Sequence, residues 1–284
     1  MAQNKQTIAF QGVLGAYSHQ ACSEVYPDAQ PLACNTFEAA IAAVLSGEAD
    51  LAMLPVENST YGRVADIHHL LPESGLHIIG EHFVRVHINL LGHKGTKLED
   101  IKAAKSHTVL LGQCRSFLKE HNIRPVVGAD TAGSAQEVAA QSDPTLGALA
   151  SELAGEIYGL DVLARHIEDF SNNTTRFLVM APQEYRREMV PYEEGTEFIT
   201  SFVFRVRNIP AALYKVMGGF ATNGINMVKL ESYMLDGSFT VTQFYADVVG
   251  HPDEPALQRA LEELDYFTTH VEMLGVYKAD KTRH

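Results

Sequence analysis

Short polar clusters stand where the sequence pattern predicts that strands end and helices begin. They hold hydroxyls, amides and an arginine, and they are Tyr17-Ser18-His19, Glu57-Asn58-Ser59-Thr60, Ser106-His107, Thr131 and residues 172–176. In an open α/β sheet, ligands lie at the carboxyl ends of strands, and helix N-termini offer N–H groups to anions. The clusters therefore predict an anion-binding site. The alternative is that Ser, Thr and Asn act there only as caps and turn formers.

The elements that must position these clusters alternate between short apolar strands and helical stretches over roughly the first 180 residues. We expect strands over 7–10, 51–54, 76–79, 82–91, 126–127, 146–150 and 176–180. We expect helices from about residue 17 and over 36–46, 109–119, 134–140 and 152–158. Thr36 and Gly47 stand at the cap positions of the second helix, and Pro55 should close the second strand. The alternation favours an α/β fold with mostly parallel sheets.

A charged, irregular segment over 183–196 reads as a linker, and a second unit follows over 197–284. Its pattern predicts the order βαββαβ, the ferredoxin-like plan, with a hairpin turning at Asp236-Gly237. One expected sheet face is rich in apolar side chains, namely Phe202, Phe204, Val228, Leu230 and Phe244. An open face of this kind predicts pairing with a second copy of the chain. The alternative is that these side chains pack under the unit's own helices.

Composition excludes several classes of function. The chain has 284 residues, with 22 Lys+Arg against 35 Asp+Glu and a net charge of −13. This charge argues against nucleic acid and anionic membranes as partners. The three cysteines are widely spaced, and no HExxH, P-loop, GxSxG or GxGxxG motif occurs. We therefore expect no metal and no cofactor. The polar N-terminus does not resemble a signal peptide, so we expect a cytoplasmic protein.

Six motifs in order resemble those of the prephenate dehydratase family. They are Gly12 to His19, Leu54 to Ser59 with Gly62, Ser106-His107 with Gln113-Cys114, Thr131-Ala132, Tyr158-Gly159-Leu160 and Asn173 to Phe177. The match departs from the family pattern at Thr108-Val109, which replace Pro-Gln, and at Asp130, which replaces Ser. The second unit resembles an ACT domain, an amino-acid-sensing module.

The resemblance implies a catalytic domain over 1–182 made of two α/β lobes, similar to type II periplasmic binding proteins, with the active site in the cleft between them. The chain would cross between the lobes near 81–90 and return near 166–172. It also implies a reaction. Prephenate would lose its ring carboxylate as CO2 and its ring hydroxyl as water, giving phenylpyruvate.

The resemblance assigns catalytic roles to Thr175, Glu57 and Arg176. Threonine is a very weak acid, so Thr175 would act as a hydrogen-bond donor or as one link in a proton relay. Arg176 would offset the substrate's charge or hold a neighbouring carboxylate. Glu57 would have a raised pKa if it faced the dianion, or it would only position its neighbours. Substrate-binding residues would be Asn58, Ser59, Ser18, Ser106, Gln113 and Thr131, and the alternative role for several of them is that of a cap.

In the family, L-phenylalanine binds between ACT domains and inhibits the distant cleft. The corresponding residues here are Ala212, Leu213, Asn226, Met227, Glu231 and Ser232. The family's G-A-L reads Ala211-Ala212-Leu213, and its E-S-R-P reads Glu231-Ser232-Tyr233-Met234. We expect L-Phe to bind and inhibit with altered affinity or selectivity, in a homodimer or homotetramer.

Three further hypotheses remain open at this point. Arogenate dehydratase differs only in acting on an amine in place of the side-chain ketone. A silent amino-acid sensor would keep the cleft and the ACT domain without catalysis, and the intact motifs around Glu57 and Thr175 count against it. A plain binding protein of periplasmic type is disfavoured by the N-terminus and by the ACT unit.

Overall fold

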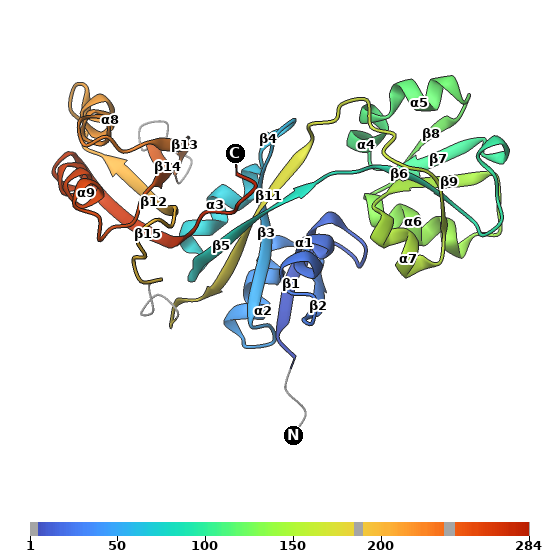
Figure 1. Ribbon diagram of the computed structural model, residues 1–284, viewed down its shortest axis with the longest axis horizontal. Helices are drawn as coiled ribbons and strands as arrows, with labels where there is room; N and C mark the ends of the chain where they lie inside the picture. The colour runs from blue at the N-terminus through green and yellow to red at the C-terminus, as the bar shows by residue number, and fades with distance from the viewer. Residues whose placement is uncertain (1–4, 185–189, 236–241, 284) are drawn as a thin grey trace.

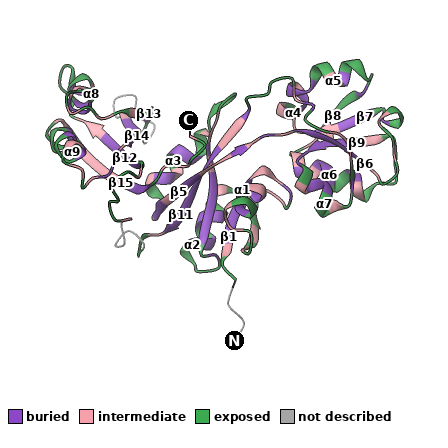
Figure 2. Cartoon of the chain, viewed as in Figure 1, coloured by how far each residue is buried: buried purple, intermediate pink, exposed green. Residues whose placement is uncertain are grey.

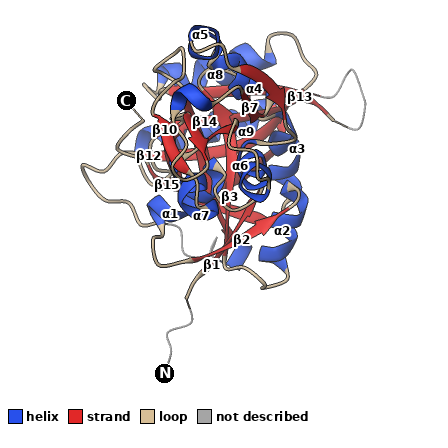
Figure 3. Cartoon of the chain, turned by 90° about the vertical axis from the view of Figure 1, so that its right-hand side faces the viewer, coloured by secondary structure: helices blue, strands red, loops and turns tan. Residues whose placement is uncertain are grey.

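The computed structural model describes residues 5–184, 190–235 and 242–283. The chain is elongated and has three parts: a first lobe in the middle of Figure 1, a second lobe on the right and a C-terminal unit on the left. One long sheet, in the order β13-β14-β12-β15-β5-β11-β3-β1-β2, runs through the C-terminal unit and the first lobe. A separate sheet, β10-β6-β9-β7-β8, builds the second lobe. Figure 3, which looks along the long axis, shows helices on both sides of the strands.

The first lobe combines parallel and antiparallel strands. Its strands are β1 (Thr7–Gln11), β2 (Gln30–Cys34), β3 (Leu51–Asn58), β4 (Gly62–Arg63), β5 (Leu76–Arg85) and β11 (Thr174–Pro182). Its helices are α1 (Tyr17–Val25), α2 (Phe37–Leu45) and α3 (Ala65–Glu73). Strands β1, β2 and β3 are parallel, but β11 is antiparallel to both β3 and β5. The expected mostly parallel sheet is therefore a mixed one, because the chain returns from the second lobe through β11.

The second lobe holds strands β6 (Asn89–Gly92), β7 (Ala103–Ser106), β8 (Arg124–Val127), β9 (Leu146–Ala150) and β10 (Asp161–Ala164). Its helical segments are η1 (Leu98–Asp100), α4 (Thr108–Gln113), α5 (Arg115–Glu120), α6 (Thr131–Ala140) and α7 (Glu152–Tyr158). The chain enters this lobe between β5 and β6 and leaves it between β10 and β11. These two connections agree with the crossings expected near residues 81–90 and 166–172.

The C-terminal unit has the expected order βαββαβ. Its elements are β12 (Phe198–Val206), α8 (Ala212–Thr222), β13 (Met227–Met234), β14 (Thr242–Val249), α9 (Pro255–Phe267) and β15 (Thr268–Lys278). The expected turn at Asp236-Gly237 lies outside the described residues. This unit joins the first lobe where β15 meets β5 in parallel, at Gly275 and Ile78. A Cβ on Gly275 would lie 2.2 Å from the Ile78 carbonyl oxygen, so only glycine permits this approach.

Both faces of the C-terminal sheet are covered within one chain. Phe202, Phe204 and Phe244 pack in a core with α8 and α9. On the opposite face, Tyr233 and Tyr245 share a core with side chains of α3 in the first lobe. Figure 2 shows how burial concentrates in the strands along the molecule. The expectation of an open face is therefore wrong, because Phe202, Phe204 and Phe244 pack under the unit's own helices, as in the alternative, and the first lobe covers the opposite face.

Two local expectations also need correction. Pro55 does not end its strand, since β3 continues to Asn58. Proline is tolerated there because it faces Phe177 at a register shift between β3 and β11. The helix expected over 109–119 is divided into α4 and α5 at Cys114. Asp169 explains the break, because its N–H donates to the Gln113 carbonyl at 2.6 Å and its carboxylate accepts from the Ser116 N–H at 3.2 Å.

Candidate active site

A chain of side-chain amides connects the two lobes and ends on the Thr175 hydroxyl. Gln113, the last residue of α4, accepts a hydrogen bond from the Asn173 amide at 3.1 Å. The Asn173 oxygen accepts in turn from the Asn58 amide at 2.6 Å. The same Asn58 nitrogen donates to Thr175 Oγ1 at 3.0 Å. Residues from α4, β3 and β11 are thus brought together at the junction of the lobes.

Asn58 has a fixed orientation in this chain. Its Oδ1 accepts from the backbone N–H groups of Thr60 and Tyr61, both at 2.9 Å. Both hydrogens of its Nδ2 are then taken by Asn173 and Thr175, so the Asn58 side chain makes its full set of hydrogen bonds. The expected role of Asn58 as a direct donor to substrate does not fit this arrangement. Asn58 instead positions Thr175, which accepts here and keeps its own hydroxyl hydrogen for another acceptor.

Arg176 does not face a cleft. Its side chain is 2% exposed, and its guanidinium binds Glu81 at 2.7 Å, Glu57 at 2.9 Å and Asp247 at 2.6 Å. Nη2 also donates to the Tyr277 hydroxyl at 2.9 Å. Of the two roles considered for Arg176, these contacts show the holding of carboxylates. The guanidinium is placed to fix the end of β11 against the C-terminal unit, not to touch a substrate.

Glu57 lies between two cations. One carboxylate oxygen accepts from Arg176, and the other accepts from Lys229 of β13 at 2.5 Å. Burial acts to raise the pKa of Glu57, but the charges of Lys229 and Arg176 outweigh it and hold the pKa below its ordinary value. The raised pKa expected for a Glu57 that faces the dianion is therefore not present in this arrangement. Glu57 is an anion at neutral pH, which fits a positioning role.

The remaining predicted residues differ in how they are placed. Ser106 is fully buried at the end of β7, and its hydroxyl donates to the Leu149 carbonyl at 2.7 Å. Ser59 is exposed and donates to the Asn172 carbonyl. Ser18 is buried in the first turn of α1. Thr131 is half-buried and begins α6, whose cap is Asp130.

These placements leave Ser18 at the N-terminus of α1, where an anion can be bound. Thr131 begins α6, whose N-terminus already binds the Asp130 carboxylate through the Gly133 N–H at 2.6 Å. Ser106 and Ser59 instead hold backbone segments in place. Gln113 retains its NH2 group as a donor at the junction of the lobes, because its oxygen is the atom that Asn173 uses.

Several residues of the site were not identified from the sequence. The motif alone assigns no role to Asn173, although its position two residues before Thr175 places both on one side of the strand edge. No local sequence motif indicates the four other residues of the site, which are Lys229, Glu81, Asp247 and Tyr277. Their partners lie far away in the sequence, and only the fold brings them together.

The predicted effector residues are divided between two ends of the C-terminal unit. Ala212 and Leu213 begin α8 beside a hollow of about 570 Å³, which is also lined by Arg205 and Arg207. Asn226 and Met227 follow the other end of the same helix. An 11-residue helix spans about 16 Å, so one chain does not bring these pairs together.

Glu231 and Ser232 have different partners again. The Ser232 carbonyl accepts from Arg63 of β4 at 3.1 Å, and the Glu231 carboxylate lies 3.6 Å from the same guanidinium. These two residues of β13 therefore contact the first lobe in this structure. Their predicted role as effector ligands gains no support from that placement.

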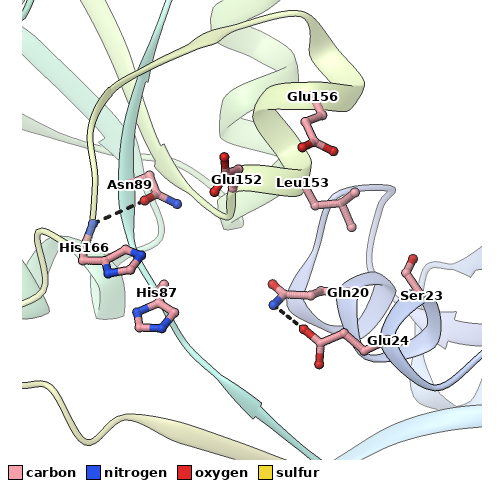
Figure 4. A pocket seen from close by; sticks show the side chains of 9 residues that line it. All are labelled: Gln20, Ser23, Glu24, His87, Asn89, Glu152, Leu153, Glu156 and His166. Carbon is pink, nitrogen blue, oxygen red and sulfur yellow. Dashed lines mark hydrogen bonds between the residues drawn. The ribbon is translucent and has the colours of Figure 1, made fainter. Parts of the chain in front are cut away.

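A separate hollow of about 350 Å³ lies between α1 and α7, beside the segments that join the lobes (Figure 4). The rings of His87 and His166 stack there with centroids 3.9 Å apart. Glu24, Glu152 and Glu156 also line it. These carboxylates disfavour a dianion, and the substrate residues predicted from the sequence do not line this hollow.

Residues 5–184, 190–235 and 242–283 contain neither a candidate metal site nor a candidate membrane-spanning helix. Within those ranges, no group of three or more His, Cys, Asp or Glu side chains is arranged to hold a metal ion. Among the same residues, no helix has both the length and the apolar character needed to cross a membrane.

Comparison with known proteins gives one consistent family. The model of the prephenate dehydratase family matches residues 8–185. A bifunctional N-acyl-homoserine lactone acylase/prephenate dehydratase of Komagataeibacter europaeus is 50% identical and covers 98% of both chains. The chloroplastic arogenate dehydratase/prephenate dehydratase 1 of Arabidopsis thaliana is 37% identical over 99% of this chain and 74% of its own.

Solved structures are also similar along nearly the whole chain, and they include one named as a quorum quenching acylase, with a TM-score of 0.91 and 49% identity over 98% of this chain and 100% of its own. The prephenate dehydratase of Arthrobacter aurescens in complex with L-Phe is 30% identical, with a TM-score of 0.85 over 98% of this chain and 91% of its own. The family match covers most of the two lobes, and it includes the strands and helices that carry the amide chain and Thr175. The chain thus belongs to the prephenate dehydratase family of hydro-lyases.

Proposed function

We propose that this protein is a prephenate dehydratase, which converts prephenate into phenylpyruvate, CO2 and water. The observation that carries the proposal is the Thr175 hydroxyl, held by Asn58 at the junction of two lobes in a chain of this family. A hydrogen bond accepted by Oγ1 polarises the O–H bond and strengthens it as a donor.

The reaction requires a donor at the leaving oxygen. The C–C bond to the ring carboxylate breaks to give CO2, and its electron pair enters the ring as the C–O bond to the hydroxyl breaks. Hydroxide is a poor leaving group, so a hydrogen bond at that oxygen lowers the barrier. Thr175 supplies this bond without becoming ionised, and the proton that completes the water comes from solvent or from the substrate's surroundings.

The other chemical groups of the site bind the substrate anion. Ser18 lies in the first turn of α1, where backbone N–H groups favour negative charge, and the Thr131 hydroxyl is a neutral donor at the start of α6. The Gln113 amide adds a neutral donor at the lobe junction. We propose that these groups bind the carboxylates, while Glu57 and Arg176 act behind the site by holding β3 and β11.

Arogenate is the alternative substrate within this reaction class. It carries an amine where prephenate has the side-chain ketone, and the Arabidopsis thaliana relative is named for both activities. Among the described residues near Thr175, no charged side chain is placed so that it would distinguish the amine of arogenate from the ketone of prephenate. Prephenate is preferred here because the family model that matches carries that name.

We further propose that the C-terminal unit is an ACT domain through which L-Phe inhibits the enzyme. The Arthrobacter aurescens relative, which was solved with L-Phe, covers this unit as well as the lobes. Ala212-Leu213 and Asn226-Met227 lie at opposite ends of α8, so a complete effector site requires these segments from two chains. This arrangement supports a homodimer or homotetramer, with β13 as the edge strand of the long sheet.

A second activity is supported by one specific finding. The relative that is named as both an acylase and a prephenate dehydratase shares half of its residues with this chain along nearly the full length of both. Hydrolysis of N-acyl-homoserine lactones is therefore the second candidate function. It has to be tested separately, because the amide chain and Thr175 provide no reason to expect it.

One set of assays separates these possibilities. The purified protein is incubated with prephenate, with arogenate and with an N-acyl-homoserine lactone. Phenylpyruvate is followed by its ultraviolet absorption, phenylalanine by chromatography and the released homoserine lactone by mass spectrometry. We expect phenylpyruvate from prephenate. Absence of product from both prephenate and arogenate would refute the proposed function and would favour a silent sensor.

A further inference from the structure

One side chain of the C-terminal unit reaches the strand that carries the active-site amide. Lys229 lies on β13, and its Nζ is 2.5 Å from Glu57 Oε2 on β3 of the first lobe. The Lys229 side chain is only 8% exposed, whereas that of Glu57 is 32% exposed. Burying a lysine in this way removes most of its conformational freedom, and the ion pair with Glu57 compensates for that cost.

The ion pair belongs to a larger group, here called the interdomain ion cluster: Glu57, Glu81, Asp247, Arg176, Lys229 and Arg283. Each carboxylate has a cation, because Arg283 also binds Glu81 and Lys229 binds Glu57. Arg176 alone is shared among Glu57, Glu81 and Asp247. Lys229 also lies 3.7 Å from the Glu231 carboxylate, which pairs with Arg63 as well. Loss of Lys229 would therefore leave one excess negative charge beside Glu57, which would keep only Arg176.

Glu57 is next in the chain to the residue that positions Thr175. In the pairing of β3 with β11, Glu57 lies opposite Arg176 and Asn58 lies opposite Thr175, directly beside a register shift. A strand is less constrained where its register is irregular, so side-chain contacts have more influence on its geometry there. The two cations that hold Glu57 therefore help to set where the Asn58 amide meets Thr175 Oγ1.

We propose that Lys229 is a positioning residue for the dehydratase site, acting through Glu57 to hold Asn58 against Thr175. The C-terminal unit then completes the catalytic geometry in addition to any role in sensing an effector. This proposal rests on the proposed function. It assigns to Lys229 no contact with substrate.

The test compares three variants of the full-length protein with the wild type: Lys229→Met, Lys229→Arg and Lys278→Met. Methionine keeps the length and apolar stem of lysine without its charge, and arginine keeps the charge. Lys278 is the matched control, because it lies in the same unit and pairs with Glu193 on the surface, with the two side chains 53% and 61% exposed. Steady-state kinetics with prephenate and thermal unfolding are measured for each protein.

We expect Lys229→Met to lower kcat by about tenfold with KM changed less than about twofold, because displacement of a transition-state donor reduces kcat. Lys229→Arg should keep most of the wild-type kcat, and Lys278→Met should match the wild type. If the Lys229–Glu57 ion pair only stabilised the fold, Lys229→Met would lower the melting temperature without lowering kcat more than it changes KM. Wild-type kinetics in Lys229→Met, or equal losses in Lys229→Met and Lys229→Arg, would overturn the proposal.

A double-mutant cycle distinguishes the proposed role of Lys229 from a general folding defect. In a Glu57→Gln background, Lys229→Met should change kcat by less than about twofold, because Lys229 acts through the carboxylate that is already gone. Fully additive losses would refute the proposed route through Glu57. If the wild type gives no product from prephenate, the proposed function fails and this role fails with it. An active wild type with an unaffected Lys229→Met refutes only the positioning role.

Discussion

Replacement of Asp247 by asparagine should destabilise the join between the C-terminal unit and the first lobe. The Asp247 side chain is fully buried on β14, where Oδ2 binds Arg176 at 2.6 Å and Oδ1 accepts from the Ser201 hydroxyl at 2.6 Å. Asparagine has the same shape and can still accept from Ser201. With its oxygen still accepting from Ser201, the asparagine NH2 group faces the Arg176 guanidinium, so the change removes both the negative charge and the hydrogen-bond acceptor from a buried ion pair.

The magnitude follows from the surroundings of Arg176. Breaking a buried ion pair by removing one partner costs about 3–5 kcal/mol. Arg176 keeps Glu81 and Glu57, so we expect a loss just below that range, about 2–3 kcal/mol. The entropy of unfolding is about 2.1 cal/mol/K per residue, or about 0.6 kcal/mol/K for 284 residues. The melting temperature should therefore fall by about 3–5 °C.

The pH dependence has a definite sign. Burial acts to raise the pKa of Asp247, but Arg176 outweighs it and holds that pKa below its ordinary value. The charged carboxylate therefore stabilises the fold at neutral pH, and this contribution is lost as the pH falls through the folded pKa. The difference between wild type and Asp247→Asn should stay constant from about pH 8 to pH 5 and shrink below about pH 4.

Thermal unfolding followed by circular dichroism measures this effect. Asp265→Asn is the matched control, since Asp265 is exposed on α9 of the same unit. We expect the control to melt with the wild type at every pH. A melting temperature of Asp247→Asn within about 1 °C of the wild type at pH 7 would refute the reasoning, because a buried ion pair cannot then be contributing the predicted amount.

Three further predictions concern the C-terminal unit and the side of the first lobe that packs against it. Ala211 has a φ of +61°, so Ala211→Gly should raise the free energy of unfolding by about 0.5–1 kcal/mol in urea titrations, and a loss of stability would contradict the strain. His68 is 1% exposed, and among the described residues its ring nitrogens have no hydrogen-bond partner. Burial lowers the pKa of His68 to about 4, so the wild type should lose stability as the pH falls from about 6.5 to 4. The His68→Phe variant should lose less stability over this range, and parallel curves of unfolding free energy against pH for the two proteins would contradict this. Light scattering at micromolar concentration should give a dimer or tetramer, and a monomeric mass would remove the two-chain effector site.

Elements with strong local signals could be predicted from the sequence. Thr36 caps α2 by accepting from the Ala39 N–H at 3.1 Å, and Gly47 follows the helix with a φ of +77°. The βαββαβ order of the C-terminal unit also followed from its periodic apolar positions. In each case the residues that determine the structure are neighbours in the chain, so their pattern carries the information.

Contacts between distant residues could not be predicted in this way. Asp169 divides one expected helix at Cys114, although it lies more than fifty residues along the chain. Lys229 is 172 residues from Glu57, and Asp247 is 71 residues from Arg176. The motif placed Glu57 and Arg176 near the site, but their charged partners determine that Glu57 stays ionised and that Arg176 is buried behind the strand edge.

The central claim is that the Thr175 hydroxyl acts as a donor at the leaving oxygen. The most direct test is phenylpyruvate formation from prephenate by the wild type, Thr175→Ala and Thr175→Ser, with unfolding curves to confirm that all three are folded. Loss of a transition-state donor should reduce kcat by about two orders of magnitude in Thr175→Ala. Thr175→Ser should retain much more activity, because its hydroxyl can still accept from Asn58 and donate to the substrate. Equal losses in the two variants, or a fully active Thr175→Ala, would contradict the account.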